Sequence, residues 1–238
     1  MASHQNPSTL ENRFLSLAGV IASCYFILWA SPITFFSDAL SLGGSFYFLQ
    51  FERHFWQYLF AFIGVTVLSR GHLWSYGINS QNLKTSMVWL SWLYGVVIIG
   101  TFISVWTGRE FLPAGAENVH EGQYHAVIAL LVYWMSSPVA NQILFFGFGQ
   151  TILMKQWGDG LKIGRFPVVV LFSALLFTYG ATSSQFAVGE YSALFTFILG
   201  LFCGMVYWKT NSLITPMLGH AFYFGFPFFV HIIRTMFL

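Results

Sequence analysis

The chain has 238 residues, of which 56% are hydrophobic and 8% are charged, and its formal net charge is +2. Soluble domains carry roughly 25% charged residues, so the composition excludes an ordinary soluble domain and indicates an integral membrane protein. The small net charge gives no sign of an extended basic surface, and we expect no nucleic-acid partner. Two cysteines, Cys24 and Cys203, lie inside apolar runs, where we expect small buried or lipid-facing side chains rather than a disulfide or a metal pair.

A polar tail over residues 1–13 precedes the first apolar run, which is long for a signal peptide and lacks a clear cleavage site. A membrane-spanning helix needs about 20 mostly apolar residues. Seven runs fit this description: 14–32, 54–69, 86–106, 124–154, 166–182, 190–208 and 212–236. The segment 33–51 contains Asp38 and a glycine pair, and we expect it to be re-entrant or interfacial. The sequence therefore predicts an all-α polytopic transmembrane bundle of seven or eight helices, in a single domain over residues 1–238.

The fourth run, 124–154, is too long for one perpendicular span and contains Pro138. Proline removes a backbone donor and usually kinks a helix. We therefore expect one long tilted or broken helix here, or two separate elements.

Lys and Arg are distributed unevenly among the predicted loops. With a cytoplasmic N-terminus, seven of them fall on the inner side: Arg13, Arg70, Lys84, Lys155, Lys162, Arg165 and Lys209. Three fall on the outer side: Arg53, Arg109 and Arg234. Cytoplasmic loops carry an excess of Lys and Arg, so the sequence predicts a cytoplasmic N-terminus. The basic loop 155–165 is expected to be an anchor against anionic membrane lipid.

Polar side chains deep in a membrane are the default candidates for function, because placing them there is unfavourable. The predicted boundaries put these residues at depth: Asn141, Gln142, Gln150 and His220, with Tyr179, Tyr223 and His125 as further candidates. At 1.5 Å per residue, Asn141 lies roughly 18 Å and His220 roughly 12 Å from the inner ends of their helices. These comparable depths allow a hydrogen bond between the two, direct or through water.

The stretch PVANQILFFGFGQTIL, residues 138–153, resembles the signature helix of the CPBP family, which contains the type II CAAX prenyl proteases and bacteriocin-processing proteins. The family carries Glu-Glu-x-x-x-Arg in this helix. Here Asn141 and Gln142 stand at the two Glu positions, Phe146 stands at the Arg position, and Gly147 matches the glycine that follows.

Two further motifs of the family recur in order. The motif Phe-x-x-x-His corresponds to Phe177 and Ala181, and the motif His-x-x-x-Asn or His-x-x-x-Asp corresponds to His220 and Phe224. The resemblance covers about residues 70–236 and implies a CAAX-protease-like core over that range.

The resemblance implies that active relatives use a glutamate to activate water, histidines to assist it or bind a metal, and an Asn to hold the oxyanion. Asn and Gln side chains do not ionise, so they cannot replace the general base, whose loss alone lowers a rate about 10²–10⁴-fold. A catalytic zinc needs about three protein ligands, so the family's zinc site is predicted to be lost and no cofactor is expected. The sequence favours a pseudo-protease that binds membrane lipid, a peptide or an integral membrane partner.

Two alternatives remain open. One is an active CAAX-type endopeptidase with a rebuilt site, which would recruit His220, Tyr179, Tyr223 or Ser183. The other is a small integral subunit of a larger membrane complex, in which His220 could ligate a pigment or haem. In a purely structural role, Asn141 and Gln142 would form helix–helix hydrogen bonds, and His220 would be a neutral imidazole between helices. A polar cavity around these residues would favour a ligand, whereas a dry aromatic core would favour a scaffold.

Overall fold

The structure, a computed structural model, describes residues 10–30, 46–80, 82–108, 132–158, 161–184 and 192–237. These residues form seven long helical segments, one for each predicted apolar run. Six are single helices: α1 (Leu10–Ala30), α3 (Phe46–Leu68), α4 (Leu83–Thr107), α8 (Val168–Ser184), α9 (Ser192–Thr210) and α10 (Ile214–Phe237). The seventh, over residues 132–157, is called the central helix below. The prediction of an all-α helical bundle is confirmed.

Four segments are long and apolar enough to cross a membrane: Leu10–Trp29, Leu83–Thr107, Ala193–Thr210 and Ile214–Arg234. Their outer faces expose large apolar side chains, such as Trp92 and Trp106 of α4, which are 73% and 89% exposed. Exposure of such a surface to water would be unfavourable, whereas contact with the equally apolar acyl chains of lipid carries no such cost. The chain is an integral membrane protein.

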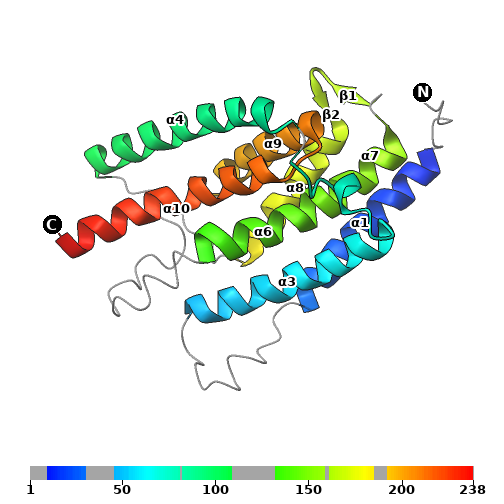
Figure 1. The fold of residues 1–238 in the computed structure, drawn as a ribbon, viewed down its shortest axis with the longest axis horizontal. Helices are drawn as coiled ribbons and strands as arrows, with labels where there is room; N and C mark the ends of the chain where they lie inside the picture. The colour runs from blue at the N-terminus through cyan, green and yellow to red at the C-terminus, as the bar shows by residue number, and fades with distance from the viewer. Residues whose placement is uncertain are drawn as a thin grey trace.

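The central helix is built from four consecutive pieces that share one axis (Figure 1). These are the π-helix η3 (Val132–Ser136), the α-helix α6 (Ser137–Asn141), the π-helix η4 (Gln142–Gln150) and the α-helix α7 (Thr151–Trp157). Pro138 therefore does not divide the run into two elements. It lies in the first turn of α6, where the hydrogen-bond register changes, and a missing N–H is tolerated best at the start of a helix.

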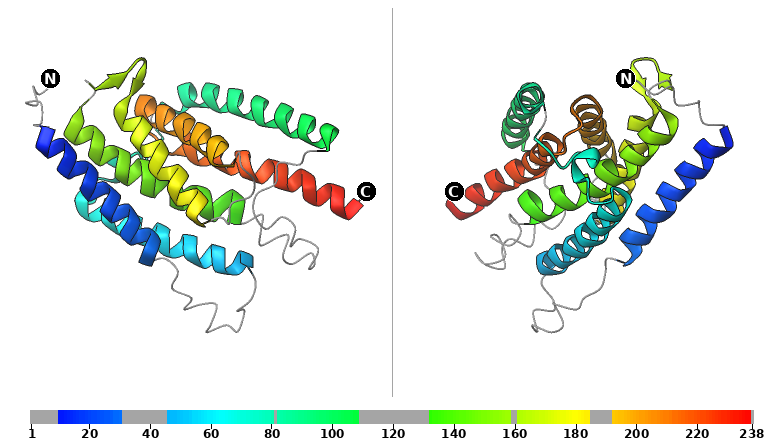
Figure 2. Two further views of the ribbon diagram at one scale, coloured as in Figure 1. Left: turned by 180° about the vertical axis from the view of Figure 1, so that it is seen from behind. Right: turned by 45° about the vertical axis from the view of Figure 1, so that its right-hand side comes forward.

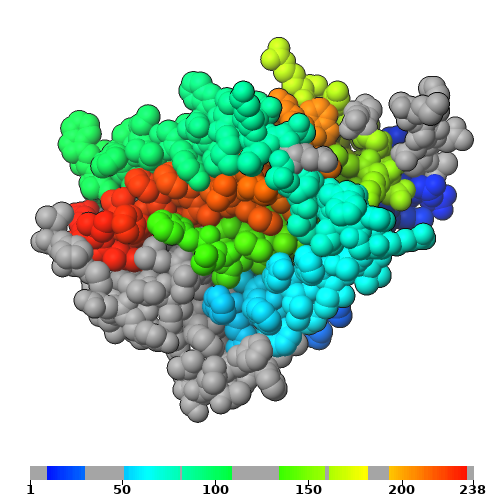
Figure 3. Space-filling model, viewed as in Figure 1, coloured from blue at the N-terminus to red at the C-terminus, as the bar shows by residue number. Residues whose placement is uncertain are grey.

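The central helix is enclosed by the other helices, as Figures 1 and 2 show. Helix α3 packs along one side of α6 and η4, α8 and α9 pack against η4, and α10 packs against η3 and α6. Helix α1 lies beside α3 and α7, and α4 lies on the outer side of α10 and α9. In the space-filling view, α10 and part of the central helix lie between α4 and α3 (Figure 3). All residues from Ala140 to Thr151 are buried.

Helix α3 begins earlier than the sequence predicted. The expected re-entrant segment 33–51 falls outside the described residues up to residue 45, but residues 46–51 form the first turns of α3. Glu52, placed before the second span by the sequence, lies inside this helix and is 2% exposed. The charges near its start hid the helix from a search for uninterrupted apolar runs.

Helices α8 and α9 approach each other closely at small residues. A methyl group added at Gly200 would meet the Cα of Ala174 at 3.1 Å, and one added at Gly204 would meet Val170 Cγ1 at 3.1 Å. Close approach of backbones at small residues is a general device of membrane helix pairs. It brings α8 and α9 together against the central helix, where the candidate site lies.

Candidate functional site

Asn141 and Gln142 lie at the junction between α6 and η4, in the middle of the bundle, and their side chains are 3% and 0% exposed. Because adjacent helical residues point in different directions, the two amides contact different helices. Asn141 is directed toward α3 and Gln142 toward α10.

Asn141 joins a short chain of hydrogen bonds between α3 and α6. Gln57 Nε2 donates to Asn141 Oδ1 at 2.8 Å, and Asn141 Nδ2 donates to Ser137 Oγ at 3.0 Å. Gln57 and Ser137 are themselves 2% exposed. The amide of Asn141 therefore has a partner on both of its polar atoms and links the two helices.

Gln142 contacts His220. The depths of the residues in their helices had suggested this contact for Asn141. Gln142 Nε2 lies 3.2 Å from His220 Nδ1. The expected hydrogen bond between Asn141 and His220 is replaced by this one, because the helix rotation directs residue 142, not residue 141, toward α10. Gln142 Oε1 is buried and has no hydrogen-bond partner within the described part of the chain.

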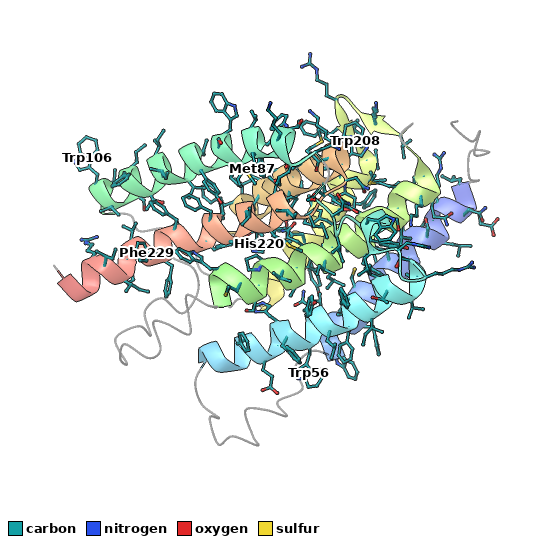
Figure 4. All side chains as sticks on the ribbon, viewed as in Figure 1. Trp56, Met87, Trp106, Trp208, His220 and Phe229 are labelled. Atoms are coloured by element: carbon teal, nitrogen blue, oxygen red, sulfur yellow. The ribbon has the colours of Figure 1, made fainter. Side chains whose placement is uncertain are left out.

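Aromatic rings surround the imidazole of His220, which lies near the middle of the bundle on α10 (Figure 4). Its ring centroid lies 5.2 Å from that of Phe177 and 5.4 Å from that of Phe224, both in edge contacts. Phe146 packs on Phe177 in turn, with centroids 5.6 Å apart. Phe146, Phe177, His220 and Phe224 are each at most 5% exposed, so the region around His220 is a buried aromatic core.

The structure thus gathers the seven motif positions in one buried cluster: Asn141, Gln142, Phe146, Phe177, Ala181, His220 and Phe224. Ala181, 2% exposed, belongs to the same core as Phe146, Phe177 and Phe224. Of the other polar candidates, Tyr179 is 57% exposed on the outer surface of α8 and lies outside the buried cluster. Tyr223 is half-buried, and the side chain of Ser183 and all of His125 lie outside the described residues.

Sequence reasoning missed the contribution of α3. His54 Nδ1 lies 3.4 Å from Ser136 Oγ, next to the Gln57–Asn141–Ser137 chain. His54 is 5% exposed, so its imidazole is a further buried polar group beside the central helix. A signal was present: in QFERHFWQYLF the polar residues 54 and 57 have helical spacing and precede an apolar run. Placing the helix start at residue 46 would have made both of them deep polar residues.

Comparison with known families gives a match over the part of the chain that holds the candidate site. Residues 123–225 match the family described as Type II CAAX prenyl endopeptidase Rce1-like. These residues form an Rce1-like domain. The match covers the central helix, α8, α9 and the first half of α10, and with them all the predicted site positions. It does not reach back over residues 70–122, for which the resemblance remains a prediction. No curated protein and no solved structure matches the chain.

Within this Rce1-like domain, the side chains do not suit the zinc ion that the family's motifs imply. Catalytic zinc takes about three His, Cys, Asp or Glu ligands. Among the described residues no three such side chains lie close enough together to share a metal ion. At the motif positions the domain offers amides, aromatic rings and one imidazole.

A haem or pigment on His220 also meets an obstacle. Nδ1 of His220 is paired with Gln142, and the imidazole makes edge-type ring contacts with Phe177 and Phe224. A planar macrocycle would have to displace these buried rings, and the described residues around His220 are packed as a core.

Proposed function

We propose that this chain is a non-catalytic member of the Rce1-like family, which uses the bundle to bind a membrane partner as a scaffold or binding subunit. The supporting observation is the character of the buried cluster. The motif positions hold Asn141, Gln142, Phe146, Ala181 and Phe224, and their side chains are engaged in packing or in helix–helix hydrogen bonds.

Physical chemistry argues against hydrolysis at these positions. A water nucleophile needs a base, and amides cannot take up a proton near neutral pH. A developing oxyanion needs a donor, and Phe224 has none. Water must also reach the scissile bond, whereas the rings of Phe146 and Phe177 fill the centre of the cluster.

We also propose an orientation. The ends of α3, α7 and α9 and the starts of α1, α4, α8 and α10 lie at one end of the bundle, called the basic end below (Figure 1). It carries seven of the nine described Lys and Arg residues: Arg13, Arg70, Lys84, Lys155, Lys162, Arg165 and Lys209. In membrane proteins the cytoplasmic loops carry an excess of Lys and Arg. This rule supports a cytoplasmic location for the basic end and for the N-terminus, because α1 starts at that end.

The proposal is tested with purified full-length protein in nanodiscs and a fluorogenic farnesylated CAAX peptide. We expect no cleavage above that of empty nanodiscs, while an active type II CAAX protease cleaves the peptide under the same conditions. The variant His220→Ala serves as the control for traces of contaminating protease. Cleavage by the wild-type protein that disappears in His220→Ala would overturn the non-catalytic function.

One observation favours the alternative of an endopeptidase with a rebuilt site. Ser136 and His54 form a hydroxyl–imidazole pair at 3.4 Å, and the buried acid Glu52 lies on the same helix as His54. A serine paired with a base is the minimal arrangement of an activated nucleophile, and such contacts are often long before substrate binds. The hydroxyl proton would move to Nδ1 as the oxygen attacks the peptide carbonyl.

This alternative makes its own prediction in the same assay. Cleavage that is lost in Ser136→Ala and in His54→Ala, but kept in Ser137→Ala, would support it. Ser137 is the matched control because it is the adjacent serine and pairs with Asn141 instead of a histidine. Absence of cleavage in the wild-type protein excludes the alternative under these conditions.

A further inference from the structure

A small β-hairpin stands at the basic end of the bundle. Strand β1 (Lys162–Ile163) pairs antiparallel with β2 (Phe166–Pro167), and Gly164, at φ +61°, and Arg165 form the turn. Figure 1 shows the hairpin projecting beyond the helices. Two-residue strands are too short to be stable by themselves, so the hairpin depends on its surroundings.

The hairpin is held to the bundle through one of its faces. Val168 N donates to the carbonyl oxygen of Leu161 at 3.0 Å, which closes the base of the hairpin onto α8. Pro167, paired with Lys162, is buried, and Lys162 Nζ lies 5.8 Å from the ring centroid of Trp208 on α9. The face with residues 162 and 167 therefore contacts the protein.

The opposite face is apolar and points away from the bundle. Residues directly opposite each other in a hairpin share a face, so Ile163 and Phe166 lie side by side. They are 64% and 43% exposed, and Leu161 beside them is 41% exposed. A hairpin facing bulk water would be expected to carry polar side chains here. Arg165 in the turn and Lys162, which is exposed although it lies on the other face, are the sequence neighbours of this apolar pair.

Basic residues near the hairpin are paired with aromatic rings in a way that suits a membrane surface. Lys209 Nζ lies 4.6 Å from the ring centroid of Trp89, which is 39% exposed, and Lys155 Nζ lies 3.9 Å from the ring centroid of the buried Tyr76. Aromatic rings with an apolar body and long basic side chains concentrate at the lipid headgroup level.

From these observations we propose that the β1–β2 hairpin is a membrane-surface anchor. Ile163 and Phe166 enter the boundary between headgroups and acyl chains, while Lys162 and Arg165 bind the phosphates of anionic lipids. Charge complementarity favours anionic phospholipid as the ligand. Basic side chains next to an apolar pair match a layer of anionic headgroups over acyl chains. The anchor is independent of the buried cluster and holds whether or not the chain is catalytic.

The test measures which lipid lies beside residue 163. The variant Ile163→Cys carries a bimane label, since Cys24 and Cys203 are buried, and the full-length protein is placed singly in nanodiscs. The discs contain a zwitterionic and an anionic phospholipid, with a headgroup-level nitroxide quencher on one or the other. Each Lys or Arg near an anionic surface contributes up to about a fivefold preference, so we expect quenching by the anionic lipid to exceed that by the zwitterionic lipid at least roughly twofold.

Two comparisons attribute the preference to the hairpin. Adding Lys162→Gln and Arg165→Gln should bring the quenching ratio close to that of the bulk lipid. Arg70→Gln with Lys84→Gln removes the same amount of charge from the basic end, and the quenching ratio should then stay above that of the bulk lipid. A label at Phe102→Cys, on the lipid-facing side of α4 toward its other end, should show no anionic preference.

Three results would overturn the proposal. The label could remain unquenched by either lipid, which would place the hairpin in water. It could be quenched equally by both, which would mean lipid contact without anionic selection. The preference could also survive Lys162→Gln with Arg165→Gln, which would mean that other cations produce it. Single occupancy of the discs prevents a second copy of the chain from covering the label.

Discussion

The hydrogen bond between Gln57 and Asn141 allows a direct test of whether the amide in the signature helix is structural. Asn141→Leu replaces the amide with an apolar side chain of similar size. It leaves Gln57 Nε2 without its acceptor and Ser137 Oγ without its donor, in a region closed to water. Gln57→Leu removes the other end of the same bond.

The magnitude follows from what is left unpaired. A buried polar group without a partner costs about 1–3 kcal/mol, so each single variant should lower the free energy of unfolding by that amount. With both residues changed to Leu, both amides are gone, so neither is left buried without its partner. Interhelical hydrogen bonds in membranes contribute about 0.6 kcal/mol on average and about 1.7 kcal/mol at most. The double variant should therefore be less destabilised than the sum of the singles by about 0.6–1.7 kcal/mol.

The free energy of unfolding is measured for the four proteins of this cycle by reversible unfolding in mixed micelles. Thr101→Val is the matched control, because this buried hydroxyl donates to Val97 O of its own helix. Its effect should stay within about 0.5 kcal/mol.

Additive single effects would refute the reasoning. They would mean that the amides do not support each other across α3 and α6. An increase in stability for Asn141→Leu would refute it more strongly, because residues kept for binding or catalysis at the expense of stability behave in that way.

The remaining predictions concern close contacts, each measured as the midpoint of thermal unfolding in one detergent. Gly180→Ala would push a methyl group into the ring of Phe145 and should destabilise by about 1–3 kcal/mol, whereas Gly95→Ala, with nothing within 4 Å, should be neutral or stabilise by up to about 1 kcal/mol. Gly225→Ala should also destabilise, because the indole of Trp134 lies against this glycine, and Trp134→Ala in the same chain should recover part of the loss. Equal midpoints for Gly180→Ala and Gly95→Ala would contradict the packing described here.

The helical class and the places of the seven described segments could be predicted, because the apolar runs are long and the bilayer requires continuous helix. The start of α3 could not: the helix begins at Phe46, eight residues before the predicted boundary at residue 54, because Glu52 and Arg53 interrupt the apolar run just before that boundary. Side chains near the end of a span can reach a polar neighbour or the membrane surface, so charge there does not exclude helix.

The meeting of the signature helix with His220 could be predicted from depth, but the residue that makes the contact could not. Depth depends on position along the helix, whereas the choice between Asn141 and Gln142 depends on rotation about the axis. That rotation is altered by the π-helical hydrogen bonding of η3 and η4, for which the sequence gives no clear signal. The partners on α3 were missed for a related reason, since nothing in a single sequence says which helices are neighbours.

The π-helical pieces of the central helix also affect how it fits the bilayer. Wound as an α-helix, residues 132–157 would be about 39 Å long, well beyond a hydrocarbon core of about 30 Å. Hydrogen bonds that reach one residue further make each turn wider and its rise per residue smaller, and η3 and η4 contain five and nine residues. The run that looked too long for one perpendicular span is shortened by its winding, which reduces hydrophobic mismatch without a break at Pro138. Helix type therefore contributes to how the segment that carries the family motif matches the bilayer.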